Sequence, residues 1–274
     1  MSRLGTLRLA LLALAFVGCI NPGPRKAWEK PPPPAHEAAV VESGAFHRST
    51  LANGVRVLAL EDPRLPRVVV GATFRRGAGA VPPARSGLAV YTASLMERGA
   101  GDRDALALAQ AVDEIGAAMS VTTGWDSTSV TLSGLSRDLD RLVEVLTDLV
   151  LRPRLDAGEA LRVRAEQLAR LGQARDDPGT VVGWAAGQTL YPDHRYGRPL
   201  SGTPETVSRL DSAAARDFHA RVFVPGNAIL FASGDIRAAD WQRRVSAAFE
   251  GWRPGSEPVE APVPPAPTPD RKSV

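Results

Sequence analysis

The chain has 274 residues, of which 44% are hydrophobic and 23% are charged, so it is long enough to bury one large core or two small ones. Its 33 basic residues barely outnumber the 30 acidic ones. Arg3 and Arg8 lie in a segment that we expect to be cleaved, and without them the chain is close to neutral. This balance does not indicate a nucleic-acid-binding protein, because such proteins carry a clustered positive surface.

Residues 1–18 have the pattern of a bacterial secretion signal. Two arginines precede the apolar stretch 9–17, LALLALAFV, which is too short to cross a bilayer as a helix. Gly18 then precedes Cys19, the only cysteine of the sequence, in a context that resembles a lipobox. We expect Cys19 to be lipidated and to anchor the protein in a bacterial cell envelope. The alternative is an ordinary signal peptide with a chance cysteine.

The residues next to Cys19 also indicate where the anchor would lie. No aspartate directly follows the cysteine. By resemblance to bacterial sorting rules, this favours the outer membrane, with the protein facing the periplasm.

Two proline-rich stretches frame the rest of the chain. Residues 19–43 contain four consecutive prolines and predict an extended spacer, and residues 254–274 hold a second such stretch. Residues 44–253 between them are expected to form one folded domain. The second stretch leads to only five further residues of the sequence, DRKSV, so we expect a truncated chain or a second folded piece that normally follows.

Hydrophobic periodicity predicts the secondary structure of this domain. The expected order is strands at 47–51, 55–61 and 67–74, helices beginning near 86 and 105, strands at 117–123 and 127–135, helices at 139–151, 156–175, after Pro178 and at 213–223, a strand at 227–235 and a last helix. Asn53-Gly54 predicts a type I′ turn between the first two strands. Hairpins and grouped helices favour an α+β fold, a mainly antiparallel sheet covered by helices.

Histidines and nucleophiles in the sequence do not suggest a site by themselves. The four histidines are far apart and form no i, i+4 pair: His36, His47, His194 and His219. We expect His194 to serve a loop and His219 to lie on a helix face. Ser94 has no base near it in sequence. Trp125, at the tip of the second predicted hairpin, is either a contact residue or a turn aromatic.

The order of these elements and several motifs resemble the insulinase/pitrilysin family of zinc metallopeptidases, which includes the mitochondrial processing peptidases. The motifs are LANGVRVLALED (51–62), GATFRRGAGAVPPARSGLA (71–89), LVLRPRL (149–155), ARDDPGT (174–180), YPDHRYGRPLSGTPETV (191–207) and FVPGNAILFASGDI (223–236). The resemblance covers residues 45–253. It implies the N-terminal lobe of such a peptidase, with a second lobe absent from the sequence.

In this family a helix carries His-x-x-Glu-His, in which the histidines bind zinc and the glutamate is the general base. The corresponding residues here are Val90, Tyr91, Thr92, Ala93 and Ser94. The third ligand of the family, a glutamate, falls near Ala169 or Arg170, with Glu166 one turn away. The resemblance therefore implies that Val90, Ala93, Ser94 and Arg170 mark a degenerate site without catalytic residues, metal ligands or zinc.

Glu97 and Gly99 match the Glu-x-Gly of a branch of the family that does not bind zinc. Members of that branch work beside a zinc-bearing partner subunit, and the two lobes enclose an extended peptide, which can pair with a sheet edge. The leading hypothesis is thus a non-catalytic lipoprotein that assists a zinc peptidase. The alternatives are an active zinc metalloendopeptidase with an unorthodox site, and a structural or binding module of the cell envelope.

Overall fold

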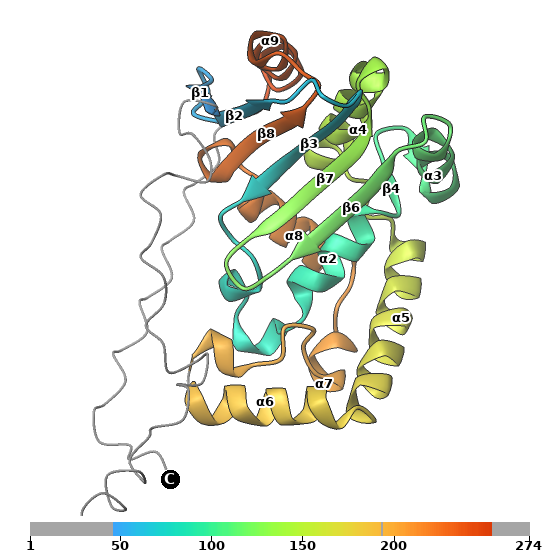
Figure 1. The fold of residues 1–274 in the computed structure, drawn as a ribbon. Coiled ribbons are helices and arrows are strands. Elements are labelled where there is room, and N and C mark those ends of the chain that lie inside the picture. Colours follow the sequence, from blue (N-terminus) through green and yellow to red (C-terminus); the bar gives the residue numbers. More distant parts are fainter. Residues whose placement is uncertain (1–45, 193, 254–274) are drawn as a thin grey trace, which may run out of the picture. The chain divides into compact units, whose positions relative to one another are not determined.

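The structure is a computed structural model that describes residues 46–192 and 194–253 (Figure 1). The predicted signal peptide, Cys19, the spacer at 19–43 and the stretch at 254–274 lie outside the described residues, so these assignments stay predictions. Among the helices that the structure describes, none combines the length and the apolar character that crossing a membrane requires.

Six strands form one mixed sheet in the order β1-β2-β8-β3-β7-β6 (Figure 1). They are β1 (Phe46–Thr50), β2 (Arg56–Glu61), β3 (Arg67–Phe74), β6 (Ala118–Thr123), β7 (Thr128–Leu135) and β8 (Ala228–Gly234). Neighbouring strands pair antiparallel, except that β2 and β8 run parallel. The predicted α+β class with a mainly antiparallel sheet is therefore confirmed.

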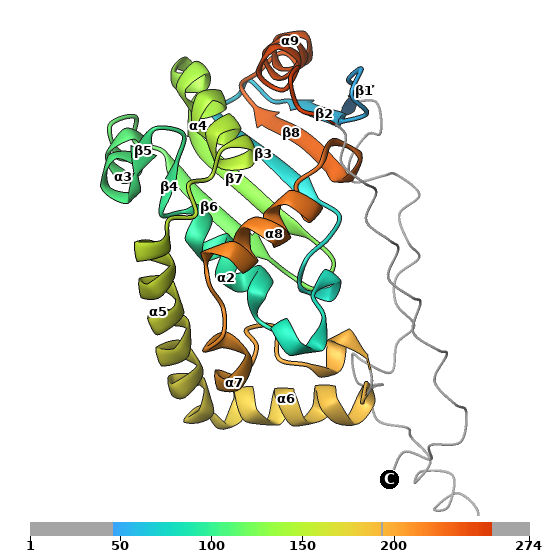
Figure 2. The ribbon, with the colours of Figure 1, turned by 180° about the vertical axis from the view of Figure 1, so that it is seen from behind.

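Helices cover one face of this sheet, as the view from behind shows (Figure 2). They are α2 (Leu88–Met96), α4 (Leu139–Leu151), α8 (Ser212–Val222) and α9 (Ala238–Ala248). Two further helices, α5 (Ala157–Arg175) and α6 (Pro178–Leu190), extend past the edge at β6 and meet at a sharp corner (Figure 1). Shorter elements fill the connections: β4 (Gly99–Ala100), β5 (Arg103–Asp104), α3 (Ala105–Asp113) and α7 (Pro204–Val207).

The core lies between the sheet and these helices. Alternate residues of β3 point into it, and α4, predicted as a helix at 139–151, contributes a stripe of leucines, of which Leu142, Leu146 and Leu149 are fully buried. Trp241 of α9 is the largest fully buried side chain of residues 46–192 and 194–253. Burial of large apolar side chains contributes roughly 1.5–3 kcal/mol each, so this layer is the main source of stability.

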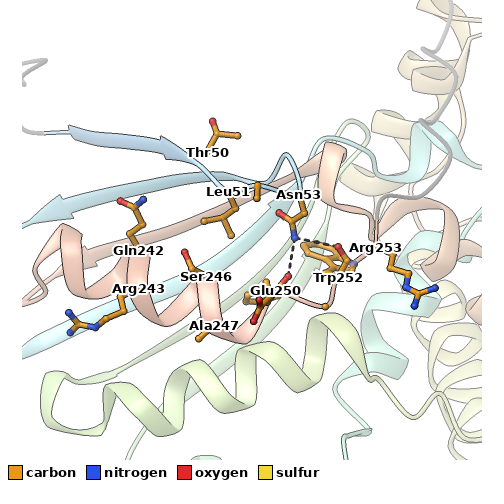
Figure 3. A pocket seen from close by; sticks show the side chains of 13 residues that line it. Thr50, Leu51, Asn53, Gln242, Arg243, Ser246, Ala247, Glu250, Trp252 and Arg253 are labelled. Atoms are coloured by element: carbon orange, nitrogen blue, oxygen red, sulfur yellow. Dashed lines mark hydrogen bonds between the residues drawn. The ribbon is translucent and has the colours of Figure 1, made fainter.

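The connection between β1 and β2 is not the predicted type I′ turn. That turn needs positive φ at both central residues, but Leu155 is the only non-glycine residue with positive φ in the described part of the chain, so Asn53 does not qualify. Asn53 instead donates from Nδ2 to the carbonyl oxygens of Phe249 at 2.9 Å and Trp252 at 3.3 Å (Figure 3). The backbone N–H of Gly54 donates to the carbonyl oxygen of Leu51 at 2.9 Å, so a local turn of another type is present and a long-range tie joins it to the end of α9.

Candidate functional site

The helix α2, which holds the motif positions, begins at a glycine for a steric reason. Gly87 caps the helix with a φ of 92°. A Cβ atom at this residue would come within 2.6 Å of the carbonyl oxygen of Ser201. Only glycine adopts this conformation without strain and leaves that space free. The chain can therefore turn from the sheet into α2 while staying in close contact with the loop at Ser201.

Buried hydrogen bonds fix α2 against α5. The Tyr91 hydroxyl donates to the carbonyl oxygen of Ala160 at 2.9 Å. Gln167, which is only 1% exposed, donates from Nε2 to the carbonyl oxygens of Gly87 at 3.2 Å and Ser201 at 2.9 Å. These contacts hold the N-terminal half of the helix, from its cap at Gly87 to Tyr91.

The three positions that match the family's zinc ligands and base share one face of α2. Val90, Ala93 and Ser94 have the spacing i, i+3, i+4, which brings side chains together on a helix, whereas Tyr91 and Thr92 between them are fully buried. Val90 and Ala93 have no side-chain atom that binds a metal or a proton. A catalytic zinc ion needs three protein ligands, so the residues present do not fit it.

The α5 side of the site does not supply the missing groups. Ala169 and Arg170 are exposed, and Glu166 accepts hydrogen bonds from Nη2 of Arg98 at 2.9 and 3.1 Å. Nη1 of Arg170 lies 4.0 Å from the same carboxylate. Across residues 46–192 and 194–253, no group of three or more histidine, cysteine, aspartate or glutamate residues is placed to hold a metal ion.

The described histidines have structural contacts, as expected for His194 and His219. Nδ1 of His194 accepts from the backbone N–H of Tyr196 at 3.3 Å, within a loop. Nε2 of His219 lies 3.0 Å from the carbonyl oxygen of Val150, and burial lowers the pKa of His219 to about 4. His36 lies outside the described residues. Trp125 packs edge-on against Tyr196, with ring centroids 5.9 Å apart, so it is engaged within the molecule.

Sequence reasoning noted Glu97 as part of a motif but did not foresee its contact. Glu97 follows α2 directly, and its Oε1 accepts a hydrogen bond of 2.7 Å from the backbone N–H of Val121 in β6. Because β6 is the last strand of the sheet, this carboxylate occupies part of a free strand edge. Burial raises the pKa of Glu97.

A surface hollow with a volume of about 980 Å³ lies elsewhere on the molecule (Figure 3). It is lined by the β1–β2 connection, by α9 and by the segment that follows α9, including Leu51, Gln242 and Trp252. No residue of α2 or α5 lines it. The hollow is therefore separate from the motif positions.

The sequence of this chain matches a known protein family. The model of the insulinase family, peptidase family M16, matches residues 56–204. The chain belongs to the insulinase family. An uncharacterised zinc protease of Streptomyces coelicolor is 28% identical over 231 residues, which cover 84% of this chain and 50% of that protein. One from Mycobacterium leprae is 27% identical over 73% of this chain and 45% of its own length.

Solved structures share the fold of this M16 chain. A structure described as a peptidase M16 inactive domain from Pseudomonas fluorescens has a TM-score of 0.74 at 21% identity and covers 79% of this chain and 53% of its own. Pitrilysin has a TM-score of 0.70 at 22% identity, covering 79% of this chain and 24% of pitrilysin. The chain spans about half the length of the curated relatives that it matches.

Proposed function

We propose that this M16 chain is a non-catalytic peptidase-like lobe that holds extended peptide beside a zinc-bearing partner of the same family. The observation that carries the proposal is the face of α2 formed by Val90, Ala93 and Ser94. It carries neither metal ligands nor a base where the family places them. The carboxylate nearest in sequence to the third ligand position, Glu166, is paired with Arg98.

The comparisons support the lobe in two ways. The curated relatives are named zinc proteases, so the chemistry of the family is metal-dependent proteolysis. The neighbour from Pseudomonas fluorescens is described as an inactive domain, which supports a non-catalytic role for a lobe of this fold. Since this chain spans about half of its relatives, the activity and partners of the whole protein belong to the proposal.

The proposed binding of extended peptide is based on the exposed edge of strand β6. The outer edge of β6 has no strand partner among the described residues, and such an edge presents unpaired N–H and C=O groups. An extended peptide can add to it through backbone hydrogen bonds, a mode that accepts many sequences. The same edge lies next to α2, beside the positions where a catalytic lobe would cut.

Location is part of the proposal as well. Lipidation of Cys19 would anchor the chain in the cell envelope, at the outer membrane facing the periplasm. Labelling with a fatty-acid analogue tests this, because a Cys19→Ser variant is expected to lose both the label and the membrane fraction.

Metal analysis of the purified chain tests the loss of zinc. We expect far less than stoichiometric zinc after dialysis, and no cleavage of unstructured peptides. The matched variant Val90→His, Ala93→Glu, Ser94→His, Ala169→Glu restores the family's residue types and is expected to bind zinc. Stoichiometric zinc bound to the unmodified chain, or peptide cleavage by it, would contradict the proposal and favour an active peptidase with an unorthodox site.

Gentle extraction of the tagged protein from its own cells tests the partner. We expect an insulinase-family protein with an intact His-x-x-Glu-His to copurify in near-equal amount. Recovery of the chain alone, or with unrelated envelope proteins, would instead indicate a peptidase fold used as a binding module.

A further inference from the structure

The edge of β6 has a regular pattern of outward-facing backbone groups. In an antiparallel pair, successive residues direct their N–H and C=O alternately toward the partner strand and away from it. The N–H of Val121 points away from β7, because it donates to Glu97. By this alternation, Met119 and Thr123 also present their backbone groups at the outer edge. Val121 is therefore the central one of three outward positions along β6.

Glu97 occupies this central position as a strand would. Its Oε1 lies 2.7 Å from the Val121 nitrogen, the distance at which the carbonyl oxygen of an added strand would accept the same bond. Hydrogen bonds to ionised acceptors are roughly twice as strong as those between neutral groups. A peptide that pairs continuously along β6 must therefore replace a strong contact at its centre.

We propose that Glu97 is an intramolecular competitor for strand addition, and that its carboxylate must leave Val121 before an extended peptide can pair across the middle of β6. This inference rests on the proposed peptide-holding function. The affinity for peptide then depends on the side chain of Glu97 at the C-terminal end of α2 as well as on the edge strand β6.

A purely structural role for Glu97 would be to tie α2 to the sheet, and the other contacts of α2 separate the two roles. Tyr91 and Gln167 anchor this helix to α5 and to the loop at Ser201. Arg98, next in sequence, pairs with Glu166. Loss of the Glu97 carboxylate is therefore expected to leave α2 in place and the Val121 N–H open to solvent or to a peptide.

The test measures binding of a fluorescent, proline-free peptide of alternating Thr and Val flanked by Lys, using anisotropy and the full chain. Loss of a charge-assisted bond predicts about tenfold tighter binding by Glu97→Ala. Glu97→Gln keeps a carbonyl acceptor and is expected within about threefold of the unmodified chain. Glu114→Ala, which removes an exposed carboxylate of α3's C-terminal end, is the control and is expected to change nothing.

A second peptide, N-methylated at alternate residues, shows whether the gain comes from backbone pairing. We expect Glu97→Ala to bind it no better than the unmodified chain does. An equal gain for both peptides overturns the proposal. The proposal is also overturned if Glu97→Ala binds the unmethylated peptide no more tightly than the unmodified chain does. In that case, binding of this peptide by the unmodified chain would still support the peptide-holding function.

If neither chain binds either peptide, the peptide-holding function fails and the competitor role fails with it. Circular dichroism checks that the variants fold. If Glu97→Ala does not fold, Glu97→Ser is measured instead, because its side chain is two bonds shorter and is not expected to reach Val121.

Discussion

Two carboxylates of this molecule each face two arginines, and they differ in burial. Asp148 of α4 has a side chain that is 4% exposed, and its carboxylate accepts bonds from Arg103 at 2.8 Å and Arg152 at 3.2 Å. Glu166 of α5 has a side chain that is 42% exposed and lies beside Arg98 and Arg170. The first cluster joins α4 to the loop around β5, and the second lies at the degenerate site.

The difference in burial means that two similar sets of charged side chains contribute unequally to stability. Removing one partner of a buried ion pair leaves a charge without compensation and is strongly destabilising, whereas an exposed pair contributes about 0–1 kcal/mol. Because Asp148 is itself buried, although Arg103 and Arg152 are 26% and 63% exposed, the Asp148 cluster contributes more to the stability of the fold. The Glu166 cluster can change at little cost to stability, which leaves the site face open to functional change.

Asp148→Ala gives the largest expected effect. It removes the buried acceptor of Arg103 and Arg152 and leaves a cavity beside Gly101, whose backbone approaches the carboxylate closely. We expect a loss of about 3 kcal/mol in the free energy of unfolding, measured by urea denaturation, because two charge-assisted hydrogen bonds are lost while Arg103 and Arg152 stay partly solvated. A loss below about 1 kcal/mol would contradict the assignment of this cluster to the fold.

A buried histidine, His219, adds a prediction about how the stability of the fold depends on pH. The folded-state pKa of His219 is about 4, below the unfolded value of about 6.5, so folding favours the neutral imidazole. Its contribution to stability is complete above about pH 6.5 and is lost as the pH falls toward 4. The expected loss is at most about 3 kcal/mol.

The control for this pH dependence is His219→Gln, which cannot titrate. The difference in unfolding free energy between the two chains is expected to change between pH 7 and pH 4. A difference that stays constant over this range would show that His219 titrates alike in the folded and unfolded states.

Tyr91→Phe removes a buried hydrogen bond between neutral groups. Its expected effect on the free energy of unfolding lies between those of the Asp148 and Glu166 variants. Burial raises the pKa of Tyr91 to about 12, so the hydroxyl is a protonated donor at neutral pH. Its loss leaves the carbonyl oxygen of Ala160 without this partner and is expected to cost about 1–2 kcal/mol. Thermal unfolding beside Tyr91→Leu separates the hydroxyl from the ring, because the leucine variant loses both.

Glu166→Ala gives the smallest expected effect. Since its ion pairs with Arg98 and Arg170 are half exposed, the unfolding free energy is expected to change by less than about 1 kcal/mol, and by even less at high salt. A loss as large as that of Asp148→Ala would erase the distinction between the two clusters.

Local patterns predicted much of this fold. The leucine stripe of α4 and the hairpin of β6 and β7 depend on residues close in sequence, so periodicity identified them. The pairing of β2 with β8 and the tie from Asn53 to Phe249 join residues more than 170 positions apart, and such contacts leave no periodic signal. The hairpin between β1 and β2 was therefore predicted correctly, whereas the type of its turn at Asn53-Gly54 was assigned wrongly.

The candidate site was predictable only through the resemblance to the family. Val90, Ala93 and Ser94 are ordinary small residues, and nothing in their chemistry marks them as a site. The bond from Val121 to Glu97 links a side chain to a backbone group. Residue types do not encode such a bond, because every residue except proline offers the same N–H.

The place of β8 in the sheet bears on how the chain acquires its structure. Residues 228–234 come last in sequence among the described strands, yet they lie between β2 and β3. Until a ribosome has released them, the β1–β2 hairpin has no neighbour in the sheet and β3 has one uncovered side. Closure of such distant contacts is slow, so nascent chains would expose two incomplete sheet edges until residues 228–234 have left the ribosome.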